Sequence, residues 1–192
     1  MRIVDIADAV LSDAARRRDG RAPFLIAVDG RCAAGKSTLA HELARRSGCV
    51  VLPMDHFFLR PEQRTEERFR EPGGNVDRER FLSEALLPLR AGAPFSYRPF
   101  DCRTLSLAAP VSVVPAELCV VEGSYSCHPA LREHYDLTVF LDVSPDEQLR
   151  RIRARNGLDG ARRFADRWIP LEERYFSACF VREHCALYFL SE

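Results

Sequence analysis

Short apolar runs separated by amphipathic stretches recur along this chain. Four runs have the length and composition of buried parallel strands, at residues 24–29, 49–54, 118–121 and 136–142, and a fifth candidate covers residues 186–190. Strands that alternate with helices are joined by right-handed crossovers, which place helices on both faces of a parallel sheet. The pattern therefore predicts an α/β fold built on a five-stranded parallel sheet with helices on both faces.

Residues 1–20 and 144–170 are expected to be mainly helical. Ile3, Ile6 and Val10 lie at helical spacing, which predicts an amphipathic N-terminal helix before the first strand. In residues 144–170, which we call the lid region, Ser144 can cap a helix whose first position is a proline. Both segments are expected to belong to a single domain that covers residues 1–192.

Two other segments interrupt the alternation of strands with helices. Residues 59–76 are rich in arginine and glutamate and end in Glu71-Pro72-Gly73-Gly74-Asn75, which predicts a surface loop. Residues 94–115 contain several prolines between short β-like runs, so we expect a small β-hairpin insertion that projects from the sheet.

The motif with the clearest chemistry follows the first predicted strand. It reads Gly30-Arg31-Cys32-Ala33-Ala34-Gly35-Lys36-Ser37, a complete G-x-x-x-x-G-K-[ST] phosphate-binding loop, and Thr38 continues the helix after it. Backbone N–H groups of such a loop and the dipole of the following helix both attract phosphate. Lys36 is expected to bridge the β- and γ-phosphates of ATP, and the Ser37 hydroxyl to bind Mg²⁺. The sequence therefore predicts a P-loop NTPase whose residues from Gly30 to Thr38 contact the nucleotide.

Two carboxylates are placed to work beside this loop. Asp55 closes the second predicted strand and Glu122 closes the third. Ligand-binding groups of parallel sheets gather at the carboxyl ends of the strands, so both side chains should face the phosphates. One can accept the proton of an attacking hydroxyl, and the other can hold Mg²⁺ or its waters. We expect Asp55 to be the base and Glu122, at the Walker B position, to serve the metal.

A cluster of arginines follows the fourth predicted strand. Positions 151 and 155 share one helix face, and positions 150 and 153 share another. Guanidinium groups that close over the γ-phosphate would stabilise the charge of phosphoryl transfer. A solvated basic helix face is the alternative for any one of them.

These motifs together resemble the uridine kinase/phosphoribulokinase group of P-loop kinases, over about residues 22–190. The resemblance rests on the phosphate loop, the lid-region arginines and the segments Met54-Asp55-His56-Phe57-Phe58, Tyr97-Arg98-Pro99-Phe100-Asp101 and Val121-Glu122-Gly123-Ser124-Tyr125. It implies that Asp55 takes the proton of the acceptor hydroxyl and that Arg151 and Arg155 contact phosphate. It also implies that the hairpin residues Tyr97, Arg98 and Asp101 bind the acceptor. The chain departs from the group in its hairpin, where uridine kinases usually carry Tyr-Asp-Phe, and in its short lid region.

The leading function is an ATP-dependent kinase for a small molecule, with a nucleoside as the expected acceptor because the aromatic rings of Tyr97 and Phe100 could stack on a flat base. A sugar, a vitamin precursor or a nucleoside monophosphate is the alternative acceptor, and GTP is the alternative donor. A regulatory NTPase is the competing class of function, although the sequence has no Asn-Lys-x-Asp motif for reading guanine.

Composition excludes several partners. Lys+Arg and Asp+Glu both number 28, so no net charge draws the chain to nucleic acid or an anionic membrane. No apolar run reaches the roughly 20 residues of a membrane span, and a signal peptide's apolar core is lacking, which predicts a cytoplasmic protein that can still form homo-oligomers. The 7 cysteines include no C-x-x-C pair, so neither a disulfide framework nor a zinc site is expected. Cys32, inside the phosphate loop, could be oxidised, but a tolerated small residue is the simpler interpretation.

Overall fold

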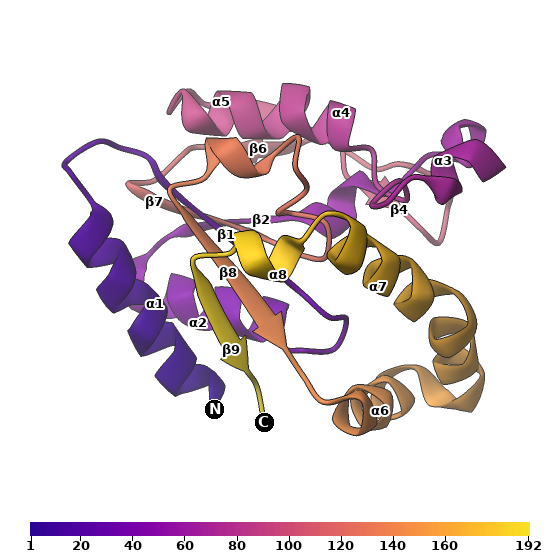
Figure 1. The fold of residues 1–192 in the computed structure, drawn as a ribbon. Coiled ribbons are helices and arrows are strands. Elements are labelled where there is room, and N and C mark those ends of the chain that lie inside the picture. Colours follow the sequence, from indigo (N-terminus) through magenta and orange to yellow (C-terminus); the bar gives the residue numbers. More distant parts are fainter.

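A five-stranded sheet forms the centre of the protein in the computed structural model, which describes residues 1–192 (Figure 1). All its strands run parallel, in the spatial order β2-β7-β1-β8-β9. Their bounds are Phe24–Gly30 for β1, Val50–Pro53 for β2, Leu118–Glu122 for β7, Leu137–Asp142 for β8 and Leu187–Leu190 for β9. The predicted fold class is confirmed, and each strand lies within one residue of its predicted bounds.

Successive residues of the central strand β1 point to opposite faces of the sheet and enter two separate cores. Ile26 and Val28 pack with apolar side chains of α1 and α2. Leu25 and Ala27 pack on the other face, where helices α4, α5, α7 and α8 supply the partners. Figure 1 shows the two helical layers on either side of the sheet. The bounds are Ile3–Arg17 for α1, Lys36–Ser47 for α2, Arg78–Phe81 for α4, Leu87–Arg90 for α5, Ile169–Ala178 for α7 and Val181–His184 for α8.

The lid region is helical on both sides of a kink, and its second part leads directly into α7. It consists of α6 (Pro145–Arg163) and the π-helical turn η5 (Phe164–Trp168), with a kink at Gly157, whose φ is 71°. Ser144 caps α6 by accepting a hydrogen bond from the backbone N–H of Glu147, as its position before Pro145 predicts. No helix of the structure combines the length and the apolar character needed to span a bilayer.

The segment predicted as a surface loop is only partly one. Residues 59–76 contain the short helices η2 (Pro61–Gln63) and α3 (Glu66–Arg70) at the surface. The end of the segment turns inward, however, because Val76 forms an isolated β-bridge with Phe58 and is fully buried in the core. The prediction failed there because the glycines and proline that mark a turn say nothing of its depth in the fold.

The hairpin insertion is confirmed as two antiparallel pairs of short strands. Phe95–Tyr97 (β3) pairs with Val111–Val113 (β6), and Phe100–Asp101 (β4) pairs with Ser106–Leu107 (β5). The remaining elements are η1 (Met54–Phe57), η3 (Leu82–Leu86) and η4 (Arg132–His134).

Candidate active site

The phosphate loop joins β1 to the N-terminus of α2, as its sequence predicts. Gly30 ends β1 with a φ of 133°, and a Cβ atom there would lie 1.9 Å from the carbonyl oxygen of Leu141 on β8. Gly35 caps α2 with a φ of 97°. These two positions require glycine, one for close packing of strands and both for backbone conformation. The loop is thereby held with the positive end of a twelve-residue helix pointing into a cavity.

Lys36 is a buried cation whose side chain meets only neutral partners. Its Nζ donates hydrogen bonds to the carbonyl oxygens of Gly30 at 2.7 Å and Arg31 at 2.8 Å, and lies 3.2 Å from the hydroxyl of Ser124. The side chain takes part in no ion pair although its residue is only 8% exposed. A buried charge without a counter-ion is costly. The loop therefore fits an anionic group such as a triphosphate.

Ser37 and Glu122 place oxygen ligands beside Lys36. The Ser37 hydroxyl donates to the carboxylate of Glu122, at 3.1 and 3.2 Å from its two oxygens. Burial, with the charge of nearby Asp55 as the next cause, raises the pKa of Glu122 above its ordinary value. Hydroxyl and carboxylate oxygens are the ligands that Mg²⁺ prefers, and a divalent cation would relieve the cost of burying Glu122. The pair therefore fits the metal role predicted for it.

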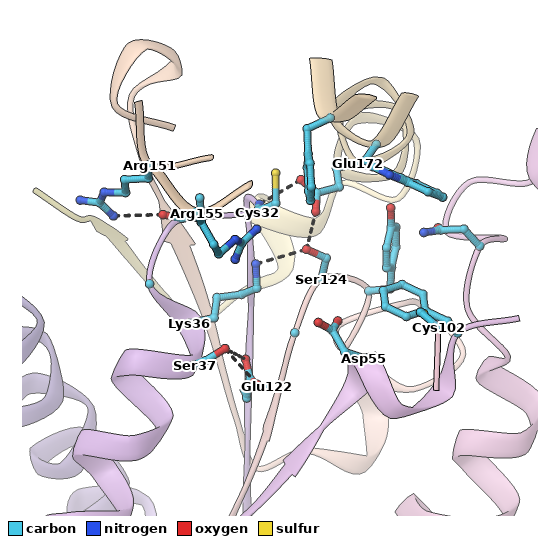
Figure 2. A pocket seen from close by; sticks show the side chains of 18 of the residues that line it. Cys32, Lys36, Ser37, Asp55, Cys102, Glu122, Ser124, Arg151, Arg155 and Glu172 are labelled. Atoms are coloured by element: carbon cyan, nitrogen blue, oxygen red, sulfur yellow. Dashed lines mark hydrogen bonds between the residues drawn. The ribbon is translucent and has the colours of Figure 1, made fainter. Parts of the chain in front are cut away.

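Asp55 lies across the same cavity. It belongs to η1, directly after β2, and its side chain is exposed. The cavity has a volume of about 900 Å³ and is lined by Asp55 as well as by Lys36 and Glu122. Figure 2 shows the Asp55 carboxylate pointing into the space beside these two residues. The register explains this proximity, because β7 pairs with both β1 and β2 and brings Glu122 level with Pro53.

Of the four clustered arginines at positions 150, 151, 153 and 155, two line the cavity. Arg151 pairs with Glu147 at 2.7 Å and donates to the carbonyl oxygen of Ala33 in the phosphate loop at 3.1 Å. Arg155 is exposed, donates a hydrogen bond to the side chain of its neighbour Asn156, and lies over the ring of Phe164. Arg151 and Arg155 line the cavity, whereas Arg150 and Arg153 do not. We call the wall formed by the phosphate loop and these two arginines the nucleotide side.

Glu172 is a cavity residue that sequence reasoning missed. It lies on α7, is only 5% exposed, and accepts hydrogen bonds from the backbone N–H of Cys32 at 2.9 Å and from the Ser124 hydroxyl at 2.6 Å (Figure 2). The next residue, Glu173, forms an ion pair with Arg31. A carboxylate of the protein thus accepts a hydrogen bond from a backbone N–H group of the phosphate loop. No local pattern could reveal this, because the donor and acceptor are 140 residues apart.

Asp29 is a second carboxylate that the sequence did not single out. It is completely buried behind the loop and accepts hydrogen bonds from the backbone N–H of Tyr125 and Cys127 and from the Tyr175 hydroxyl. Burial raises its pKa to about 6, despite these hydrogen bonds. Asp29 therefore fastens the turn after β7, which carries Ser124, to the start of the phosphate loop.

Cys32 does not have the properties of a reactive thiol. Burial and the nearby charge of Glu172 raise its pKa to about 12, so the thiolate that oxidation requires is scarce at neutral pH. The amide of Gln148 donates to both its carbonyl oxygen and its sulfur. The interpretation as a tolerated small residue fits this environment.

The predicted acceptor residues of the hairpin do not line the cavity. Tyr97 is only 4% exposed and packs on Phe57, with ring centroids 5.0 Å apart, while its hydroxyl lies 2.8 Å from Nδ1 of His56. Arg98 donates to carbonyl oxygens of its own hairpin, and Asp101 bonds to Arg103. The expectation of an exposed ring at Tyr97 is wrong, because the side chain alternates onto the same face as Phe95, toward the core.

Several other residues that belong neither to the phosphate loop nor to α6 line the same cavity as Asp55, and we call this set the acceptor side. They come from the turn after β2, the 59–76 segment, the hairpin, the turn after β7 and η5. The acceptor side includes Phe58, Arg64, Phe69, Cys102, Leu105, Tyr125, Arg167 and Trp168.

Several solved structures with a similar fold are described as kinases or proposed kinases. A protein from Bacillus stearothermophilus described as a possible uridine kinase superposes with a TM-score of 0.73 at 18% identity, over 97% of each chain. The chain has the fold of the P-loop kinases. A proposed fructose transport system kinase from Silicibacter sp. TM1040 gives a TM-score of 0.72 at 24% identity, covering 98% of this chain and 99% of that one. D-glycerate 3-kinase from Cryptococcus neoformans gives 0.64 at 16% identity, over 98% and 94%.

No protein-family model matches the chain. The similarity to the three kinases therefore establishes the fold, and their acceptors differ from one another in chemical type.

Proposed function

We propose that this protein is an ATP-dependent kinase that transfers the γ-phosphoryl group to a hydroxyl of a small molecule. One observation carries the proposal: Asp55, an exposed carboxylate without an ion-pair partner, opens onto the same cavity as the buried cation Lys36, whose direct hydrogen-bond partners are all neutral. A base and a phosphate-binding cation across one cavity are what phosphoryl transfer to a hydroxyl needs.

The residues divide the reaction between them. Lys36, the loop amides and the lid-region arginines would hold the polyphosphate and stabilise its charge. Asp55 would accept the proton of the acceptor hydroxyl while its oxygen forms a bond to the γ-phosphorus. The bond from that phosphorus to the β–γ bridging oxygen breaks, and ADP leaves. Ser37 and Glu122 would hold Mg²⁺, which supplies neutralisation of phosphate charge when bound.

The aromatic rings of the hairpin do not indicate which acceptor the protein binds. The expectation of a nucleoside rested on stacking against Tyr97 and Phe100, and each of these side chains is only 4% exposed and outside the cavity. That argument for a nucleoside therefore does not hold. Asp55 supports a hydroxyl as the group that is phosphorylated. The residues of the acceptor side bear on the rest of the acceptor molecule.

A coupled assay of ADP release tests the proposal. With ATP and Mg²⁺ present, we expect ADP to form rapidly only when a hydroxyl-bearing acceptor is added from a panel of sugars, hydroxy acids, vitamin precursors and nucleosides. A regulatory NTPase would release ADP and phosphate at the same rate without any acceptor, and that result would refute the kinase. Replacing ATP with GTP in the same assay identifies the preferred donor.

A further inference from the structure

Two arginines of the acceptor side remain without a counter-ion. Arg167 lies on η5, and its guanidinium carbon is 5.0 Å from the ring centroids of both Phe69 and Trp168. Cation–π contacts of this kind fix the position of a guanidinium but leave its charge unneutralised. Arg167 lines the cavity, and its side chain forms no hydrogen bond or ion pair within the protein.

Arg64 stands out among its neighbours in the same way. Every other arginine between residues 60 and 80 forms at least one ion pair, namely Arg60, Arg68, Arg70, Arg78 and Arg80. Arg64 forms none: its Nε donates to the carbonyl oxygen of Leu59 at 3.0 Å, and its guanidinium carbon lies 5.4 Å from the ring centroid of Phe100. These contacts leave the outer nitrogens of a cavity-lining guanidinium without a protein partner.

The Arg64 guanidinium belongs to the neighbourhood of Asp55. Asp55, Arg64 and Cys102 line the same cavity. In keeping with this, burial raises the pKa of the Cys102 thiol, the charge of Arg64 lowers it and the charge of Asp55 raises it. Lys36, Arg151 and Arg155, in contrast, line the nucleotide side. The cations of the cavity therefore fall into two groups, and only one of them is needed for a triphosphate.

The aromatic rings of the acceptor side favour a charged acceptor over a flat neutral one. The Arg167 guanidinium already lies against two of the rings, those of Phe69 and Trp168. Of the other aromatic residues named for the acceptor side, Tyr125 is only 3% exposed and Phe58 is half-buried. The acceptor side therefore presents the fixed guanidinium of Arg167 to an incoming molecule. Guanidinium groups bind carboxylates and phosphates through paired, charge-assisted hydrogen bonds.

We propose that the acceptor is a small hydroxyl compound that carries a carboxylate or phosphate group, and that Arg64 and Arg167 bind this group and determine specificity. The inference rests on the proposed kinase function and extends it to the substrate class. The acceptor hydroxyl faces Asp55, and the anionic group is held by the two guanidiniums, which orients the molecule for transfer.

Matched acceptor pairs test this inference in the ADP-release assay. Glycerol is compared with glycerate, ribose with ribose 5-phosphate, and uridine with its 6-carboxylate, so that the arms separate carboxylate from phosphate. We expect kcat/KM to be at least about tenfold higher for the anionic member of the pair that is turned over best. Raising the ionic strength should increase KM for that compound and leave KM for its neutral partner unchanged.

Substitution of the two arginines gives the second arm. Arg64→Gln and Arg167→Gln should each raise KM for the anionic acceptor about 10- to 100-fold, with KM for ATP unchanged. Arg64→Lys should restore part of the loss, because the charge is retained. Arg163→Gln is the matched control, since Arg163 is an exposed arginine of α6 that does not line the cavity.

The outcomes that contradict the inference are distinct from those that contradict the kinase. A neutral acceptor that is turned over at least as well as its anionic partner overturns the inference alone. So does an equal rise of the KM values for ATP and acceptor in both glutamine variants. ADP release that no acceptor accelerates refutes the kinase, and the inference falls with it.

Discussion

Lys36 and Asp55 line the same cavity but have different roles, which substitutions should separate. The direct hydrogen-bond partners of Lys36 are all neutral, so Lys36→Ala should weaken ATP binding and lower kcat by about 10²–10³-fold. Steady-state kinetics together with calorimetric titration of ATP measure both effects. A variant with near-normal kcat would exclude the loop as the catalytic phosphate site.

Asp55→Asn should lower kcat by about 10²–10⁴-fold with ATP affinity nearly intact. The amide keeps the shape of the exposed side chain but cannot accept the proton of the acceptor. The same kinetic and calorimetric measurements apply. If ATP affinity collapsed while the acceptor-dependent rate stayed normal, Asp55 would be a metal residue, and Glu122 would become the better candidate for the base.

Tyr97 is expected to act on stability and not on substrate binding. Tyr97→Ala removes a ring that packs on Phe57 in the core, and should lower the free energy of unfolding by about 3–5 kcal/mol. Tyr97→Phe loses the hydroxyl that bonds to His56 and should cost about 1 kcal/mol. Urea unfolding measures both values. A selective rise in acceptor KM at unchanged stability would restore Tyr97 to the acceptor site.

Asp29 should titrate far above an ordinary aspartate, because burial raises its pKa to about 6. Between about pH 4 and pH 6 the native state holds a proton that the unfolded chain has released, so this group lowers stability as pH rises through that window, by up to about 3 kcal/mol. Carbon-13 NMR of the Asp29 carboxyl group measures its midpoint directly. A midpoint below pH 4 would mean that its hydrogen bonds outweigh the cost of burial.

The residues found from sequence and those missed differ in how far apart their partners lie. The phosphate loop is a local pattern, so its spacing alone predicted Lys36 and Ser37. Glu172 depends on a partner 140 residues away, and adjacent glutamates on a helix do not reveal which one turns inward. Tyr97 could have been predicted better, since it shares a strand face with Phe95.

At the scale of elements, the strands of the sheet and the hairpin insertion were predictable, and the burial at the end of the 59–76 segment was not. A strand buried on both faces reads as a continuous apolar run, and every residue of β1 is buried. The 59–76 segment gave no such signal, because its polar composition describes its surface helices and not the buried Val76 at its end. Turn-forming residues predict where a chain bends, but not how deeply the bend is packed.

The helix α7 connects the lid region to the phosphate loop through Glu172. A buried carboxylate on a loop amide repels an incoming polyphosphate, so Glu172→Gln should tighten ATP binding about tenfold. Calorimetry measures the affinity. Asp166→Asn removes the same charge from an exposed position on η5 and serves as the control. Weaker binding in Glu172→Gln would show instead that the carboxylate positions Ser124 for the nucleotide.

At the scale of the whole molecule, the order of the strands decides where the chemistry lies. The loop follows β1, Asp55 follows β2, and β7 lies between these two strands and carries Glu122. The sequence predicted that all three strands belong to one parallel sheet, but not which of them are neighbours. Strand order arises from long-range packing on both faces, which no local pattern encodes.

The position of β7 also has a consequence for how the protein is made. When residues 24 to 53 have left the ribosome, β1 and β2 do not yet have their native partner, because the place between them belongs to a strand that begins at Leu118. Contacts between segments so distant in sequence form late and slowly. A nascent chain therefore has the complete loop sequence well before it has a site, and its two unpaired strands are exposed to aggregation until β7 arrives.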